Sequence, residues 1–273
     1  MLDKVSLIHP YYKDRKRLDL QFGIWSQWSE RVCKAVDITI VDDGSPEPLQ
    51  LTSSEQEFFE RKGIKFAVFR ILEDLKWNTP GALNLGVLVS PQPWVLFQDS
   101  DCFFESSMWE KILDLDHPIN KIGKFERKRY GNPETENLEN HRYLNCTMLM
   151  HKHVFMHLGG FDEDFTGQYS GGYGFFDTEF DARAEKWGVW SEYCYGPAHR
   201  VYREIIAGEW MPSVCGEPVP RDPREHHKKN KIILNSKKAG TTSQNRHILN
   251  FSWQCTYSNW IKIQHERRKP VPQ

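Results

Sequence analysis

Two carboxylates with one residue between them, Asp99 and Asp101, directly follow the apolar run 94–98. In an extended segment, side chains two residues apart face the same way, so these two acids can act together. Paired carboxylates suit a hard divalent cation that keeps open positions for phosphate oxygens. A solvated acidic turn is the alternative interpretation of the same triplet. The first hypothesis is therefore a metal site that holds a phosphate-bearing ligand.

A second acidic pair, Asp42 and Asp43, ends another apolar run and precedes Gly44, which permits a tight turn. The first apolar run of the chain ends in His9-Pro10. In open α/β sheets, ligands bind at the carboxyl ends of the strands. If the three apolar runs are strands of one sheet, we expect these polar groups to collect along one edge of it.

The elements that must position these groups alternate at the cadence of a parallel α/β sheet. Strands are predicted at 5–9, 37–41, 65–69 and 94–98, and helices at 15–33, 55–62 and 81–89. The predicted fold class is therefore α/β, a sheet flanked by helices.

The second half of the chain loses this cadence, so we expect it to fold onto the first sheet. Strands are predicted at 121–130, 141–150 and 193–199, helices at 151–157 and 177–187, and a mobile proline-rich loop at 201–230. We expect a single domain over 1–230, with one half at 1–105 and the other at 106–230. Residues 231–273 are expected to form a basic C-terminal extension.

Composition excludes several function classes. Among 273 residues, 36 Lys and Arg oppose 37 Asp and Glu, which leaves a net charge of −1. No field of the whole molecule draws it to nucleic acid, so we expect no nucleic-acid partner. The sequence shows no signal peptide and no transmembrane segment, and its six cysteines are scattered. We therefore expect a cytoplasmic protein, with a peripheral membrane contact through the C-terminal basic run as a minor hypothesis.

Three runs, IVDDGSPEP, WNTPGALNLG and WVLFQDSDC, occur in that order along the first half. They resemble the nucleotide-binding half of family-two-type glycosyltransferases of the GT-A fold, in order and in spacing. The resemblance implies a mixed, Rossmann-like nucleotide-binding sheet, with a nucleotide-binding half at 1–105 and an acceptor and metal half at 106–230. The resemblance implies a UDP-sugar donor, Mn²⁺ or Mg²⁺ as cofactor, and Asp99 and Asp101 as metal ligands. The donor-binding residues that it implies are His9, Pro10, Tyr11, Asp42, Asp43, Asn78, Gly81, Asn84 and Asp99.

A further pair of runs, GGFDE at 159–163 and GYGFFD at 172–177, lies in the middle of the chain. It resembles the GGFDE…GWGxED signature of galactosyl- and N-acetylgalactosaminyltransferase-type enzymes. The resemblance implies that Asp177 is the general base of an inverting reaction and that Tyr173 and Phe176 lie on the acceptor side. Tyr173 replaces the Trp of that signature, and Phe176 replaces its Glu.

Asp177 is also a candidate on chemical grounds. Inversion at an anomeric carbon needs a carboxylate that takes the proton from the attacking hydroxyl. An Asp at the start of a helix is otherwise most often an N-terminal cap. The glycine- and aromatic-rich loop before it favours the catalytic interpretation, because the rings of Tyr169, Tyr173 and Phe175 offer flat faces for a sugar.

A metal held by two carboxylates usually has a further protein ligand, and histidine is the commonest. His199 follows the predicted Asp177 helix and one more strand, where the resembling enzymes place their metal histidine. A surface histidine beside Arg200 is the alternative. His226 and His227, in a basic run beyond the proline-rich loop, are the second choices.

These features together predict a metal-dependent, inverting glycosyltransferase that moves a hexose or N-acetylhexosamine from a UDP-sugar to an acceptor hydroxyl. The acceptor can be a glycan, a lipid or a protein. A non-catalytic relative that binds nucleotide sugars or glycans is the alternative, prompted by Phe176. A phosphatase with a DxD motif is disfavoured, because three predicted strands precede the one that leads into the triplet and Cys102-Phe103 follow the triplet.

Overall fold

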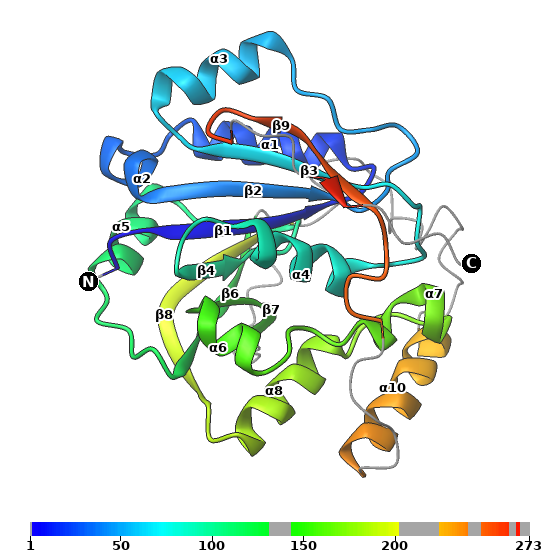
Figure 1. Ribbon diagram of the computed structural model, residues 1–273. Helices are drawn as coiled ribbons and strands as arrows, with labels where there is room; N and C mark the ends of the chain where they lie inside the picture. The colour runs from blue at the N-terminus through cyan, green and yellow to red at the C-terminus, as the bar shows by residue number, and fades with distance from the viewer. Residues whose placement is uncertain (1, 131–142, 202–223, 240–246, 262–265, 268–273) are drawn as a thin grey trace.

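The computed structural model describes residues 2–130, 143–201, 224–239, 247–261 and 266–267. Within these residues one sheet of ten strands crosses the molecule, with helices on both faces (Figure 1). The strands are β1 (Val5–Tyr11), β2 (Val36–Asp42), β3 (Phe66–Ile71), β4 (Trp94–Phe97), β5 (Cys102–Phe103), β6 (Lys121–Tyr130), β7 (Tyr143–His151), β8 (Trp190–Val201), β9 (Trp253–Ser258) and β10 (Glu266–Arg267).

The strand order is β10-β9-β3-β2-β1-β4-β7-β6-β8-β5. The first four strands, β1 to β4, are parallel and lie in the order β3-β2-β1-β4. Since β2 and β3 extend the sheet to one side of β1 and β4 to the other, the topology switches between β1 and β4. Open α/β sheets bind their ligands at such a switch point, outside the carboxyl ends of the strands.

The later strands add to both sides of this parallel core. On the β4 side, β7 is antiparallel to β4 and to β6, β6 runs parallel to β8, and β8 is antiparallel to β5. On the β3 side, β9 and β10 form an antiparallel edge. The second half of the described chain therefore continues the first sheet, and the predicted α/β class with a mixed sheet is confirmed.

Helices cover both faces of the sheet (Figure 1). Residues of α1, α2, α3 and α5 share one buried apolar cluster with the strands, and residues of α4, α6, α8 and α10 share the cluster on the opposite face. The helices are α1 (Arg15–Trp25), α2 (Glu30–Ala35), α3 (Ser53–Lys62), α4 (Thr79–Val89), α5 (Ser106–Asp114), α6 (Lys152–His157), the 3-10 helix η2 (Glu163–Phe165), α7 (Gly167–Ser170), α8 (Phe176–Lys186) and α10 (Arg224–Lys238).

The period-two alternation of strands explains this division. In β1, Leu7 belongs to the cluster under α1 and α3, whereas Ile8 belongs to the cluster under α4 and α6. Both side chains are fully buried, as expected of a parallel strand covered on its two faces. In the described residues, no helix combines the length and the apolar composition that crossing a membrane requires.

Three predicted elements differ from the structure. The helix expected over 15–33 is two helices, because the Ser29 side chain accepts a hydrogen bond from the Val32 amide and starts α2. Of the loop expected over 201–230, residues 202–223 lie outside the described residues, and residues from Arg224 onward are helical. The region 231–273, expected as an extension, instead supplies β9 to the sheet.

Candidate active site

The Asp99-Ser100-Asp101 triplet forms a tight turn at the carboxyl end of β4. The backbone amide of Cys102 donates to the Asp99 carbonyl oxygen at 2.9 Å, which closes the turn. Asp99 and Asp101 are partly exposed, while Cys102 is buried. The ligand atoms of Asp99, Asp101 and Cys102 all lie within 4.8 Å of one another. The predicted pair of carboxylates therefore faces one site at the topological switch point.

Two buried polar side chains of helix α1 donate hydrogen bonds to this turn. The Arg17 guanidinium donates to the Ser100 hydroxyl at 3.2 Å, and the Gln21 amide donates to the Cys102 carbonyl at 2.6 Å. Gln98 donates in turn to the Gln21 amide oxygen at 3.0 Å. Sequence reasoning missed Arg17 and Gln21, although their spacing of four residues places them on one face of a helix.

The donor set fits a hard divalent cation. The carboxylate oxygens of Asp99 and Asp101 are the ligand type that Mg²⁺ and Mn²⁺ prefer. The buried Cys102 thiol contacts Asp101 Oδ1 at 3.4 Å and supports that carboxylate. The backbone of β8 pairs with β5 so that the Cα of His199 is opposite Phe103, two residues after Asp101. The side chain of His199, like that of His226, lies outside the described residues.

The carboxyl end of β2 carries a buried Asp–Asn pair. Asp43 accepts hydrogen bonds from the backbone amide and from the side-chain amide of Asn78, both at 3.1 Å. Burial raises the pKa of Asp43 to about 8, against the hydrogen bonds from Asn78 that lower it. Gly81 lies against the same pair, since a Cβ at that position would approach Asn78 Oδ1 to 2.3 Å. Gly81 therefore leaves room for the Asn78 side chain at the start of α4.

Asp42, predicted to bind the donor, accepts hydrogen bonds that stabilise the turn after β2. Its carboxylate accepts from the backbone amides of Ser45 at 2.9 Å and Leu49 at 3.0 Å, and from the Arg70 guanidinium at 3.1 Å. With an exposed fraction of 1 %, Asp42 holds the turn rather than presenting its charge at the surface. Gly44 in that turn adopts a φ of +71°.

The end of β1 places its predicted donor residues at different depths. His9 is 1 % exposed and contacts Trp25 edge to face, with ring centroids 5.9 Å apart. Burial, helped by the charge of Arg17, lowers the pKa of His9 to about 3, so its ring is neutral. Pro10 is partly exposed and Tyr11 is largely buried. His9 therefore supports this edge from within the core, and Pro10 lies at its surface.

Asp177 lies in the first turn of α8 and faces a thiol. Its Oδ2 accepts from the Cys146 thiol at 3.3 Å, and its Oδ1 accepts from the Thr178 amide at 2.8 Å. Burial raises the pKa of Cys146 well above its usual range, and the negative charges of Asp177 and Asp99 add to the effect. Asp177, the predicted base, and Asp99, the first acid of the predicted metal pair, thus both act electrostatically on the neutral Cys146 thiol.

A partly buried ion pair that the sequence did not suggest lies beside this group. The Lys124 ammonium, 2 % exposed, contacts the Asp181 carboxylate at 2.8 Å. The charge of Lys124 acts on Cys146, and the charge of Asp177 acts on Asp181. The one available signal was the spacing of Asp177 and Asp181, which places both on one face of a helix.

The glycine- and aromatic-rich loop before Asp177 presents part of its aromatic surface and buries the rest. Tyr173 and Trp77 are partly exposed, with ring centroids 5.9 Å apart. Phe175 adopts a φ of +68° at the N-cap of α8. Phe176, predicted on the acceptor side, is 2 % exposed and packs against Trp77 and Phe161. The Phe176 ring is therefore part of the apolar core.

Asn84, predicted to flank the donor, holds the loop at 159–163. Its amide donates to the Phe161 carbonyl at 2.8 Å and to Glu163 Oε1 at 2.7 Å, and its oxygen accepts from the Phe161 amide at 2.8 Å. These bonds, on a side chain that is 7 % exposed, give Asn84 a supporting role. Burial raises the pKa of Glu163 to about 7, although the Leu249 amide and Asn84 donate to it.

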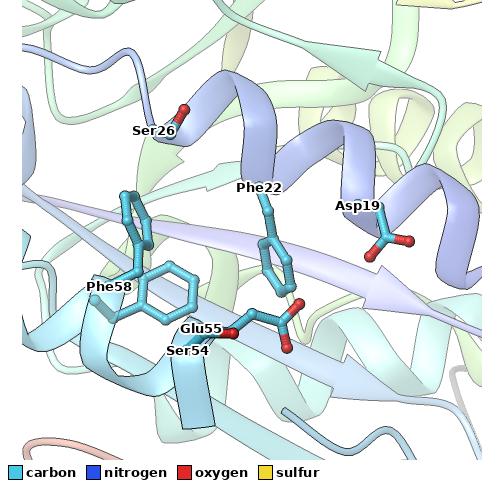
Figure 2. A pocket seen from close by; sticks show the side chains of 7 residues that line it. Asp19, Phe22, Ser26, Ser54, Glu55 and Phe58 are labelled. Carbon is cyan, nitrogen blue, oxygen red and sulfur yellow. The ribbon is translucent and has the colours of Figure 1, made fainter. Parts of the chain in front are cut away.

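A shallow pocket of about 290 Å³ lies between α1 and α3. Asp19, Phe22 and Ser26 line its α1 wall, and Ser54, Glu55 and Phe58 line its α3 wall (Figure 2). Both of its acids are ion-paired with Arg15. Residues of the strand-end site contribute nothing to this pocket, and carboxylates on both walls disfavour a diphosphate there.

Neither a protein-family profile nor a curated protein matches this sequence. Solved structures do match its fold. The S. aureus TarS fragment 1–349 in complex with UDP-GlcNAc has a TM-score of 0.57 at 15% identity, covering 84% of this chain and 65% of that fragment. Mannosyltransferase PcManGT from Pyrobaculum calidifontis, in complex with GDP-Man and Mn²⁺, has a TM-score of 0.56 at 14% identity, covering 90% of this chain and 68% of that one.

GalNAc-T7 with UDP, GalNAc and Mn²⁺ has a TM-score of 0.52 at 11% identity, covering 74% of this chain and 44% of that one. This chain therefore spans less than two thirds of the TarS fragment and of GalNAc-T7. At such identities the similarity establishes the architecture. The chain has the fold of the GT-A glycosyltransferases. Its acidic residues lie at the carboxyl ends of the strands on either side of the topological switch point between β1 and β4.

Proposed function

We propose that this protein is a metal-dependent, inverting glycosyltransferase that moves a hexose or N-acetylhexosamine from a UDP-sugar to an acceptor hydroxyl. The acceptor is a glycan, a lipid or a protein. One observation carries the proposal. The Cys146 thiol donates to the Asp177 carboxylate at 3.3 Å, and the negative charges of Asp177 and Asp99 both act on that thiol, which supports a general base near a metal ligand.

The donor side is assigned to the ends of β1, β2 and β4. Pro10, Tyr11 and Asp43 lie where the nucleoside would bind, and Asn78 fixes Asp43. Asp99 and Asp101, with His199 from β8, would hold Mn²⁺ or Mg²⁺. A bound divalent cation would supply positive charge against the departing diphosphate. Two of the similar structures contain Mn²⁺, one with GDP-Man and one with UDP, which supports a metal-bound diphosphate.

Asp177 is assigned as the general base. The acceptor oxygen forms a bond to the anomeric carbon, the bond from that carbon to the diphosphate oxygen breaks, and the proton of the attacking hydroxyl passes to Asp177. The Cys146 thiol is a weak hydrogen-bond donor, so it orients Oδ2 without neutralising the carboxylate. Tyr173 and Trp77, both partly exposed, offer aromatic faces for the acceptor sugar beside this residue.

Donor hydrolysis tests the proposal without knowledge of the acceptor, since water takes the place of the hydroxyl. The protein with Mn²⁺ is incubated with UDP-, GDP-, CMP- and dTDP-sugars, and NMR follows the released sugar. We expect release from a UDP-sugar with inverted anomeric configuration. Asp177→Asn is expected to lower the rate by on the order of 100-fold or more with an unchanged dissociation constant for the donor. Asp3→Asn, which alters an exposed acid before β1, is the control.

Two results would contradict the proposal. Tight binding of a nucleotide sugar with no turnover, in the presence of Mn²⁺, would identify a binding protein instead of an enzyme. Full turnover in Asp177→Asn, or release of the sugar with retained configuration, would remove Asp177 as the base.

A further inference from the structure

We propose that helix α10 contributes to the active site through Asn230, which acts as a positioning residue for Asp177. This inference rests on the proposed function. Helix α10 follows the last motif of the glycosyltransferase resemblance and lies beside α7 and α8 (Figure 1). The observation that carries the inference is a pair of hydrogen bonds from one buried amide to the two loops that precede Asp177.

Helix α10 is anchored at its C-terminal end by a buried ion pair. The Lys237 ammonium contacts Asp162 Oδ2 at 2.5 Å and Asp164 Oδ2 at 2.8 Å. The exposed fractions of the three side chains are 8%, 3% and 7%. Since breaking a buried pair leaves a charge without compensation, this contact fixes the helix firmly. The acids of the GGFDE motif and its neighbour therefore hold α10 against the domain.

The middle of α10 reaches into the core and the loops. Leu234 is buried in the apolar cluster that also contains Phe165, Phe176 and Phe180. One turn earlier, Asn230 is 0 % exposed. Its side-chain amide donates to the Phe165 carbonyl at 2.8 Å and to the Gly174 carbonyl at 2.9 Å. Asn230 thus ties the segment after the GGFDE motif to the loop before Asp177.

The carbonyl that Asn230 holds lies in the strained part of that loop. Gly174 has a φ of +80° and Phe175 a φ of +68°, directly before α8 starts at Phe176. A left-handed conformation at a non-glycine residue is strained and persists only where surrounding contacts impose it. The bond from Asn230 to the Gly174 carbonyl is such a contact. It sets the direction in which the chain enters the turn that carries Asp177.

His227 supports the same loop from the surface. Its ring packs against Tyr173, with centroids 4.3 Å apart, and against Phe175, with centroids 5.6 Å apart. His227 is exposed, so these ring contacts lie at the surface. Asn230 and His227, three residues apart on α10, therefore both contact the loop before Asp177. His227, a second choice as a metal ligand, acts here as an aromatic contact.

The expected consequence is a loss of turnover without a loss of donor affinity. A misplacement of a reacting group by about 1 Å costs on the order of 100-fold in rate. Asn230→Ala is expected to lower the rate constant of donor hydrolysis by about 10- to 100-fold, with an unchanged dissociation constant for the nucleotide. Asn235→Ala, an exposed asparagine on the same helix, is the matched control and should leave both values unchanged.

A double-mutant cycle with Asp177→Asn separates positioning from a general effect on structure. If Asn230 acts through Asp177, Asn230→Ala adds little further loss to the Asp177→Asn variant, because the group that it positions is already gone. Multiplicative losses, or a wild-type rate in Asn230→Ala, would overturn the inference. His227→Ala changes an exposed ring and provides a second variant, expected to lower the rate by several-fold, if Asn230→Ala does not fold.

Amide hydrogen exchange over residues 171–178 gives a readout that does not need activity. Asn230→Ala is expected to accelerate exchange there relative to wild type and to Asn235→Ala. Unchanged exchange would overturn the role of α10 even if the protein turns over no nucleotide sugar. Conversely, the variant could show faster exchange although the protein neither binds nor hydrolyses any donor. That result would support the contact between Asn230 and the loop before Asp177, and it would contradict only the proposed function.

Discussion

Replacing Asp43 by Asn should make the protein more stable at alkaline pH relative to wild type. Asp43 is 6% exposed, and burial raises its pKa from 3.8 to about 8. Its folded pKa therefore exceeds its unfolded pKa, so the stability present at low pH is lost as pH rises from about 4 through about 8. An Asn at this position stays neutral and removes that loss.

The magnitude follows from the two pKa values, 3.8 and about 8. With about 1.4 kcal/mol per pKa unit, the ionisation of Asp43 costs about 2 kcal/mol at pH 5 and about 5 kcal/mol at pH 8. Asp43→Asn also loses one of the two hydrogen bonds from Asn78, which costs about 1–3 kcal/mol at every pH. The difference in unfolding free energy between variant and wild type should therefore shift by about 3–4 kcal/mol in favour of the variant between these pH values.

Urea unfolding of both proteins at pH 5 and pH 8 measures this quantity. Comparing the variant with wild type at each pH cancels the titration of all other groups, and the hydrogen bond cancels between the two pH values. Asp3→Asn, at an exposed position, should show no shift. A shift below about 1 kcal/mol, or one of opposite sign, would refute the interpretation of Asp43 as a buried, destabilised carboxylate.

Two further changes test the packing around the site. Gly44→Ala should lower the unfolding free energy by about 3 kcal/mol or more, because its Cβ would lie 2.2 Å from the Glu73 carbonyl oxygen at a φ of +71°. Gly63→Ala has a similar φ of +68° with nothing within 4 Å, so thermal unfolding should show a loss of only about 1 kcal/mol; equal losses would contradict the clash. Lys237→Met should cost about 3–5 kcal/mol because two buried aspartates lose their partner, whereas Lys238→Met, at an exposed position, should cost less than about 0.5 kcal/mol by urea unfolding.

The sequence predicted well those features that local patterns determine. Fully apolar runs bounded by polar residues gave the four parallel strands, and the acids at their ends fell at one edge, because parallel strands share a direction. Asp99 and Asp101 lie together because one residue separates them in a single turn after β4. The electrostatic influence of both Asp99 and Asp177 on Cys146 of β7 depends on the antiparallel pairing of β4 with β7, which no local pattern specifies.

Residue roles that depend on contacts far apart in the chain were not predictable. The role of Asn84 is set by Phe161 and Glu163, 77 and 79 positions away. Phe176 has a residue type suited either to a sugar face or to a core, and only the packing of α8 decides for the core. Nothing in the sequence indicated the role of Asn230, because an Asn in a basic helical run is expected to be solvated. Only its hydrogen bonds to Phe165 and Gly174 reveal that role.

The most direct test of a metal-bound nucleotide at this edge is a thermal-shift titration of the purified protein with UDP, GDP, CMP and dTDP nucleotides, with Mn²⁺ and with a chelator. A ligand that binds the native state raises the unfolding temperature. The account predicts that a uridine nucleotide raises it with Mn²⁺, that the chelator removes the effect, and that Asp101→Ala loses the effect while Asp3→Ala keeps it. No shift with any nucleotide in the wild-type protein, or an equal shift in Asp101→Ala, would contradict it.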